Sequence, residues 1–117
     1  MQPKTPKYLE DIRDAAQFIL DLARGRTLQD YSHDRVLRQT IERNFEIIGE
    51  AMNRIAKSDP AVAARVGHYP QIIAFRNVLA HGYDLIENDR VWSVVQNELS
   101  GLPQTVEELL RESSGGT

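Results

Sequence analysis

Apolar residues recur every three or four positions along most of this 117-residue chain. That spacing puts apolar side chains on one face of an α-helix. No segment has the strict alternation of apolar and polar residues that indicates a β-strand. The pattern therefore predicts an all-α fold. We expect three long amphipathic helices and one helix that is apolar nearly all round to form an antiparallel bundle of four to five helices.

The first predicted helix spans about residues 6–24. Thr5 can cap its N-terminus, and Pro6 suits its first position, where a backbone N–H has no helical partner. Gly25 favours a C-terminal stop. The face that we expect to be buried consists of Tyr8, Leu9, Ile12, Ala15, Ala16, Ile19, Leu22 and Ala23.

The second predicted helix runs to about Lys57. Before it, residues 27–30 resemble a capping box, and residues 31–34 are interpreted as a turn between the two helices. Asn44 lies in the middle of the apolar face of the second helix. Because a buried amide needs a hydrogen bond, we interpret Asn44 as a core anchor rather than a substrate contact.

The second half of the chain predicts three more helical segments. A short helix at about 60–65 precedes a helix at about 70–82, which is apolar on both sides and is expected to be buried in the core or at a subunit contact. Gly82 permits a break after it. The last helix starts near Asp89 and is predicted to continue, kinked, through Pro103, because its apolar period is unbroken.

Composition and size fit one domain. The chain has 41% hydrophobic and 26% charged residues, an ordinary globular mixture. We assign residues 1–112 to a single helical domain and residues 113–117 to a flexible tail. The N-terminal segment is charged where a signal peptide is apolar, and the longest tight apolar stretch is Ile72–Phe75. Both features predict a protein that does not enter a membrane.

The absence of cysteine and the net charge exclude several classes of function. Without cysteine there is no disulfide framework, thiolate metal site or cysteine nucleophile, and we expect a cytoplasmic protein. The net charge of −3 argues against nucleic-acid binding over a broad positively charged surface but permits a local basic site. His33 and His68 have no His or Glu three or four positions further on, so we expect no metal site and no cofactor.

One group of polar residues interrupts the apolar helix of the second half. It comprises Arg76, Asn77 and His81, with Tyr83 just beyond. A guanidinium in an apolar stripe is costly unless it meets an anion or hydrogen-bond acceptors. Arginine is the preferred fork for phosphate, and histidine moves protons near neutral pH. Beside a phosphodiester, this pair predicts RNA cleavage without a metal.

The alternative interpretation is a buried network of Arg76 and His81 that only orders the core. The two residues are five apart, which is about 140° around a helix axis. They could meet at one atom if the arginine bends along the helix, if the helix breaks at Gly82, or if a second subunit brings its own copy. The last condition, together with the apolar helix, predicts a homodimer.

The string Arg76-x-x-x-x-His81-x-Tyr83 resembles the signature of the HEPN superfamily, and its tyrosine resembles the HepT-type branch. The segment Ile47–Ala51 resembles the IGEA segment of that branch. The similarity covers nearly all of the chain.

The resemblance implies a small helical HEPN domain that dimerises with its motifs facing each other. It implies a metal-independent endoribonuclease, the toxin of a type VII-like toxin–antitoxin system, with Arg76 and His81 catalytic and Asn77 and Glu50 in supporting roles. The expected partner is a minimal nucleotidyltransferase antitoxin that adds AMP units to Tyr83. The charge and bulk of each AMP would occupy the phosphate site and repel RNA.

A second class of function stays open at this point. A non-catalytic HEPN subunit could dock a nucleotidyltransferase and present a nucleotide or an acceptor site, since a fold alone does not decide activity. Arg76 and His81 favour the enzyme, because a docking subunit has no chemical need for both. Glu50 could pair with Arg76 or with a partner subunit, whereas Trp92 is interpreted as a core residue.

Overall fold

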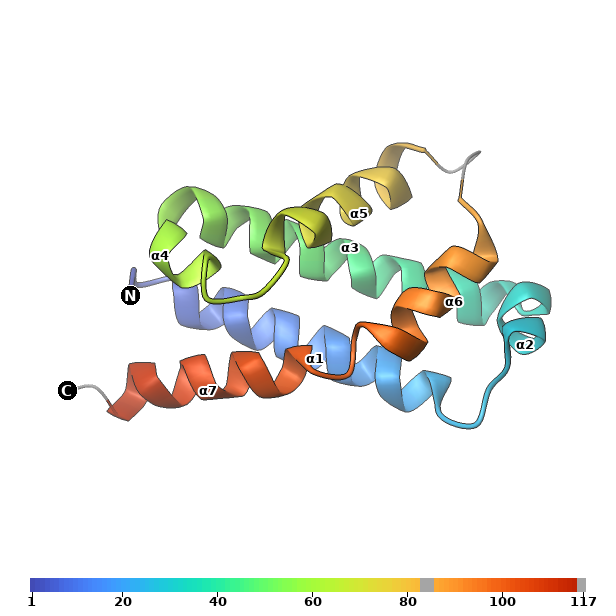
Figure 1. Cartoon of the computed structure of the whole chain (residues 1–117), viewed down its shortest axis with the longest axis horizontal. Helices are drawn as coiled ribbons and strands as arrows, with labels where there is room; N and C mark the ends of the chain where they lie inside the picture. The colour runs from blue at the N-terminus through green and yellow to red at the C-terminus, as the bar shows by residue number, and fades with distance from the viewer. Residues whose placement is uncertain (83–85, 116–117) are drawn as a thin grey trace.

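The computed structural model describes residues 1–82 and 86–115 of the chain (Figure 1). Within these residues the backbone forms helices and no strand, so the all-α prediction is confirmed. The helices outnumber the four to five that were expected. They are α1 (Thr5–Ala23), α2 (Leu28–His33), α3 (Arg35–Ser58), α4 (Pro60–Ala63), α5 (Tyr69–His81), α6 (Asn88–Asn97) and α7 (Leu102–Gly115).

The long helices form an antiparallel bundle. Helix α1 lies between α3 and α7 and runs opposite to both, and α5 packs on α3, again in the opposite direction (Figure 1). The predicted face of α1 is confirmed, because Leu9, Ile12 and Ile19 are fully buried between these neighbours. None of the helices in the described part of the chain has both the length and the apolar character that a membrane span needs.

The segment 31–34, which was expected to be a turn, belongs largely to helix α2. Its start is a capping box: the Thr27 hydroxyl accepts the backbone N–H of Asp30, and the Asp30 carboxylate accepts that of Thr27. Asp34 then caps α3 by accepting the N–H of Leu37. Two N-terminal caps seven residues apart thus create a separate short helix, and this helix buries Tyr31 completely.

The prediction of one kinked helix through Pro103 is wrong. Helix α6 ends at Asn97 and α7 begins at Leu102. Pro103 lies in the first turn of α7, where its missing N–H interrupts no hydrogen bond. The apolar period survives the break because Leu99, in the connection, is also buried. At the other end, α7 continues to Gly115, so residues 113–115 of the expected tail are helical, whereas residues 116–117 lie outside the described part.

Helix α5 is much less buried in the single chain than its apolar composition predicts. Leu79 is its one buried residue among those described. Val78 is 47% exposed, and Ala74 is exposed one turn earlier. Burial in the core of one chain is therefore wrong as an explanation of this helix, and a subunit contact remains the alternative.

Candidate active site

Helix α5 presents the polar group that the sequence singles out. His68 precedes the helix in the left-handed conformation, with φ of 61°, and Pro70 occupies its first turn. Gly82 ends the helix, and its N–H donates to the carbonyl of Val78 at 2.8 Å. The break expected at Gly82 is thus confirmed, whereas Tyr83 lies outside the described residues.

Gly49 explains how Arg76 approaches α3. A Cβ atom added to Gly49 would lie 2.1 Å from Cβ and 2.5 Å from Cγ of Arg76. No side chain fits at that distance, because carbon atoms in contact lie about 3.5–4.0 Å apart. The glycine of the Ile47–Ala51 segment therefore lets the stem of Arg76 press against the backbone of α3.

The guanidinium of Arg76 meets a carboxylate and an amide. Its Nη2 lies 3.5 Å from Glu50 Oε1, and its Nη1 donates to Asn77 Oδ1 at 3.1 Å. The side chain is 27% exposed, and its Nε is buried without a hydrogen-bond partner among the described residues. The expected pairing of Glu50 with Arg76 is confirmed. It partly offsets the cost of an arginine in an apolar stripe.

Glu50 also contacts a second arginine. Nη1 of Arg43, which lies seven residues earlier on α3, is 3.3 Å from the same Oε1 atom of Glu50. The same nitrogen lies 3.2 Å from Glu46 Oε2. One turn before Glu46 on the same helix, burial raises the pKa of the Glu42 carboxyl. The carboxylates of α3 therefore form one charged face with Arg43 among them, and Arg76 joins it from α5.

His81 lies apart from this group. It is exposed in the last turn of α5, and within the described residues no hydrogen bond joins it to Arg76. One chain thus brings together Arg76, Asn77 and Glu50 but not His81. His81 shares an exposed helix face with Ala74, Asn77 and Val78, at the three- and four-residue spacing of one side of a helix. We call these four residues the outer face of α5.

The other candidates of the sequence have structural roles. Trp92 is 8% exposed and its ring lies 5.4 Å from that of Tyr31, so its assignment to the core is confirmed. The Asn44 amide donates to the carbonyl of Thr40 at 2.8 Å, which satisfies the expected hydrogen bond within the helix. His33 and His68 are both exposed, at the ends of short connections.

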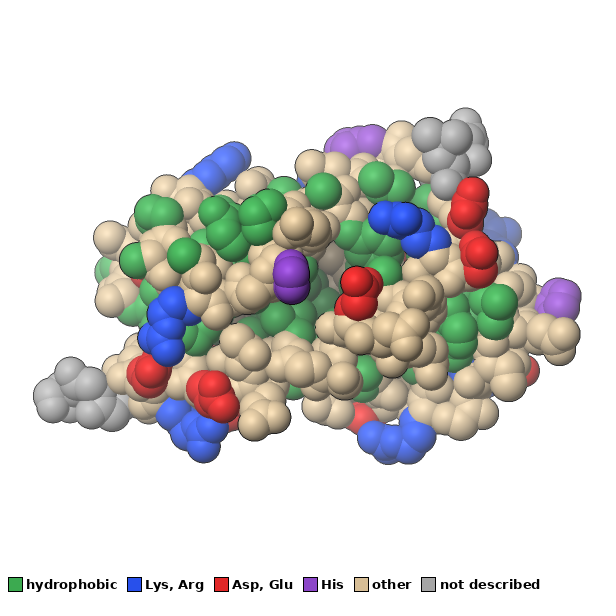
Figure 2. Space-filling view, viewed as in Figure 1, with side chains coloured by type: hydrophobic (Ala, Val, Ile, Leu, Met, Phe, Trp, Pro, Cys, Tyr) green, Lys and Arg blue, Asp and Glu red, His purple; other side chains and the backbone are tan. Residues whose placement is uncertain are grey.

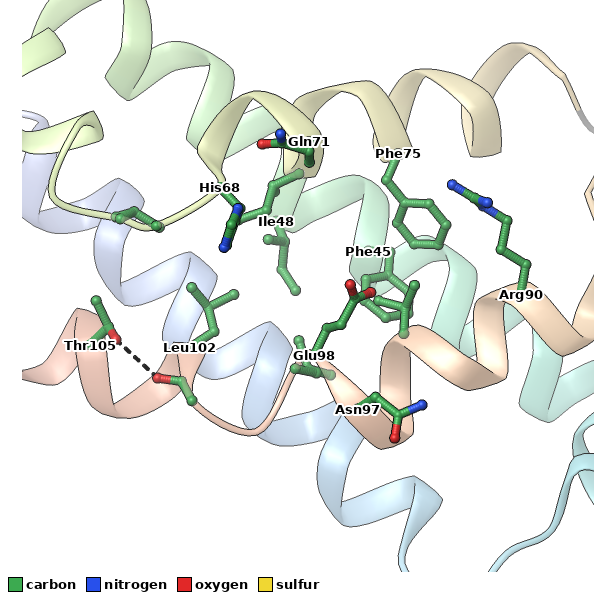
Figure 3. Close-up of a pocket in the computed structure, with 16 residues that line it drawn as sticks. Phe45, Ile48, His68, Gln71, Phe75, Arg90, Asn97, Glu98, Leu102 and Thr105 are labelled. Carbon is green, nitrogen blue, oxygen red and sulfur yellow. Dashed lines mark hydrogen bonds between the residues drawn. The ribbon is translucent and has the colours of Figure 1, made fainter.

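Sequence reasoning missed a cavity of about 620 Å³ between α5 and the α6–α7 segment. Figure 3 shows aromatic side chains, Phe45 and Phe75, on one side, and Arg90, Asn97 and Glu98 opposite. Figure 2 shows the hollow on this face of the molecule, with hydrophobic side chains at its floor. Arg76 and His81 do not line it. Helical periodicity could not reveal this cavity, because a gap between two helices leaves no trace in either period.

Comparison with known proteins finds one matching family model and relatives that are named as ribonucleases. The family model described as Ribonuclease HepT-like matches residues 9–109. The protein named "Putative RNase TTE0752" of Caldanaerobacter subterraneus subsp. tengcongensis is 30% identical over 93% of this chain and 97% of its own length. The protein named "Probable ribonuclease HepT" of Thermococcus cleftensis is 26% identical over 87% of this chain and 92% of its own length. No solved structure matches the chain.

Proposed function

Because the chain belongs to the HepT-like ribonuclease family, we propose that it is a metal-independent endoribonuclease whose catalytic residues are Arg76 and His81. The observation that carries the proposal is the arrangement of these two groups on one half of α5. The guanidinium of Arg76 is fixed against α3, and the imidazole of His81 is exposed in the last turn. Each chain thus carries a cation that is held against α3 and, five residues further on, an exposed group that can transfer a proton.

The proposed reaction uses the substrate's own 2′-hydroxyl as the nucleophile. Its oxygen attacks the adjacent phosphorus, the bond from phosphorus to the 5′-oxygen of the next nucleotide breaks, and a 2′,3′-cyclic phosphate forms. The 2′-hydroxyl loses a proton and the leaving 5′-oxygen gains one; His81 carries one of these two transfers and water carries the other. Arg76 binds the phosphate and stabilises the negative charge that grows on its oxygens.

A homodimer would complete the site. The outer face of α5 exposes Val78 and Ala74 beside Asn77 and His81 in the single chain. A two-fold contact through this face would bury these apolar side chains and bring each His81 toward the second copy of the motif. Arg76 and His81 of different subunits could then act on one phosphodiester, although they do not contact each other within one chain.

We further propose that the enzyme is the toxin of a type VII-like toxin–antitoxin system, with a minimal nucleotidyltransferase as its antitoxin. Tyr83 directly follows Gly82, the residue that ends α5, so it lies two positions after His81 in the chain. AMP attached to its hydroxyl would bring a negative phosphodiester to Arg76 in place of the RNA backbone. Inhibition would therefore act on the phosphate site itself.

A non-catalytic docking subunit is the second candidate. The observation in its favour is that Glu50 and Asn77 already engage Arg76, as they would in a purely structural network. Incubating the purified chain with RNA, with and without EDTA, separates the two candidates. Cleavage that persists in EDTA and leaves 2′,3′-cyclic phosphate ends supports the ribonuclease. No cleavage by a folded dimer, or products with 3′-hydroxyl ends, would overturn it.

A further inference from the structure

We propose that Arg43 is a positioning residue for RNA binding: by sharing the Glu50 carboxylate with Arg76, it keeps the Arg76 guanidinium available to a phosphate. This inference rests on the proposed function, in which Arg76 binds the RNA backbone. It assigns a part in that function to a residue outside the motif of α5.

The contacts place Arg43 and Arg76 on one oxygen atom. Arg43 Nη1 lies 3.3 Å from Glu50 Oε1, and Arg76 Nη2 lies 3.5 Å from the same atom. Arg43 reaches Glu50 along α3, over two helical turns, whereas Arg76 comes from α5. A single carboxylate charge is therefore divided between guanidinium groups of two helices.

This division decides how easily a phosphate reaches Arg76. A phosphate that binds Arg76 must take the place of Glu50, since both are anions that compete for the same N–H donors. With Arg43 present, the displaced carboxylate keeps a cationic partner. Without Arg43, the displaced Glu50 would keep no guanidinium contact among the described residues. Replacing Glu50 by a phosphate at Arg76 would then cost more free energy.

Arg43 acts through Glu50 rather than as a phosphate contact of its own. Its guanidinium lies between two carboxylates, those of Glu46 and Glu50, which together outweigh its charge. The side chains of Arg43, Glu50 and Arg76 are 59%, 39% and 27% exposed. Solvent screens contacts of this kind, so the expected effect on RNA affinity is modest, about two- to fivefold.

A double-mutant cycle tests this inference. The probe is a fluorescently labelled 2′-O-methyl RNA octamer, which binds but lacks the nucleophilic hydroxyl, and the measurement is its dissociation constant by anisotropy. Arg43→Gln should raise that constant about two- to fivefold in the otherwise unchanged protein. Glu50→Gln alone should lower it, because glutamine does not neutralise Arg76. In the Glu50→Gln background, Arg43→Gln should have no further effect.

Other outcomes overturn the inference. If Arg43→Gln weakens RNA binding equally in the wild-type and Glu50→Gln backgrounds, Arg43 contacts the phosphate directly. If it weakens binding in neither background, Arg43 has no part in RNA binding. The matched control is Arg65→Gln, which deletes an equally exposed arginine that pairs with Glu112 on α7. If Arg65→Gln raises the dissociation constant as much as Arg43→Gln does, the loss of one positive charge explains the effect and Arg43 has no positioning role.

The design separates this inference from the proposed function. Cleavage of RNA by the unchanged protein, without coupling between positions 43 and 50, would overturn the positioning role alone. Coupling in the binding assay, without cleavage of unmodified RNA, would overturn the nuclease and leave the positioning role standing. A folded protein that neither binds nor cleaves RNA would overturn both.

Discussion

Gly49 on α3 and Arg76 on α5 are so close that a Cβ atom on the glycine would lie 2.1 Å from Cβ of the arginine. Glycine is therefore required where the stem of Arg76 crosses α3. The next residue, Glu50, then reaches the guanidinium of the same arginine. The packing of α5 on α3 and the position of Arg76, which we propose binds phosphate, thus both depend on the adjacent residues Gly49 and Glu50.

Gly49→Ala should lower both stability and activity. The overpacked methyl group costs about 1–3 kcal/mol, which outweighs a gain in helix propensity of up to about 1 kcal/mol. Urea unfolding should show the loss, and RNA cleavage should fall further than the folded fraction does, because the stem of Arg76 is displaced from its position on α3. Gly67→Ala is the control, since an added Cβ there meets nothing within 4 Å. Equal unfolding midpoints for Gly49→Ala and the wild type would contradict the packing argument.

His81→Ala should reduce kcat for RNA cleavage by roughly 10²–10⁴-fold, the usual contribution of a general acid or base. Because His81 is exposed, the free energy of unfolding should stay within about 0.5 kcal/mol of the wild-type value. Arg76→Lys should cleave RNA more slowly than the wild type, since lysine keeps the positive charge but not the paired N–H donors of the guanidinium. Wild-type kinetics for His81→Ala would remove it from the mechanism.

Val78→Asp should convert the proposed dimer to monomers. Val78 is 47% exposed in the single chain, so an aspartate can be solvated there without disturbing the fold. Two such charges facing each other across a two-fold axis would repel, and cleavage should be lost together with the dimer. Light scattering at tens of micromolar gives the mass. An exposed position elsewhere, Val36→Asp at 76% exposure, is the control. A wild-type chain that is monomeric at that concentration would contradict the proposed interface.

Tyr83→Phe should retain much of the cleavage activity and escape inhibition by a nucleotidyltransferase partner with ATP. The substitution removes the hydroxyl that would carry AMP and leaves the ring. Peptide mass spectrometry after co-expression should find AMP units on the wild-type peptide that contains Tyr83 and none on the variant. If the wild-type protein is silenced while Tyr83 stays unmodified, inhibition works by docking instead.

Asp59 should make stability depend on pH in acid. The backbone N–H of Gln2 and the hydroxyl of Thr5 donate to its carboxylate and hold its pKa below the ordinary value. This stabilisation is complete above the pKa of the unfolded aspartate, about 3.9, and is lost as the pH falls below it. Asp59→Ala should therefore cost less than about 1 kcal/mol at pH 7, because solvent screens these largely exposed contacts, and progressively less below pH 4. A difference in unfolding free energy that is the same at pH 7 and pH 3 would contradict the assignment.

The sequence predicts this fold well wherever one helical face meets the core. The buried side of α1 follows from the spacing of its apolar residues, and the end of α5 follows from Gly82. The break before Pro103 does not, because the buried Leu99 keeps the apolar period intact across a connection that is not α-helical. Periodicity reports which side of the chain is buried, not whether the backbone between two buried residues stays helical.

The residues of the candidate site were predictable from the sequence, but only one of their contacts was. Arg76 and Glu50 are identifiable from their motif positions, and their pairing is confirmed. The part played by Arg43 could not be foreseen, because a charge spaced among glutamates on a helix usually marks a solvated surface. Only the approach of α5 to α3 shows that Arg43 and Arg76 share a carboxylate.

Helix α5 packs extensively on α3 alone among the described helices, with the cavity along its other flank. Helix α5, which carries the motif, is therefore held mainly by α3 on one side and lies outside the bundle of α1, α3 and α7. Substitutions within that bundle can change the melting temperature while leaving the tilt of α5 unchanged. Substitutions between α3 and α5, such as Gly49→Ala, change the position of the motif and the stability together. Stability can accordingly vary in relatives of this chain without a change in activity, through the contacts of α1 with α3 and α7.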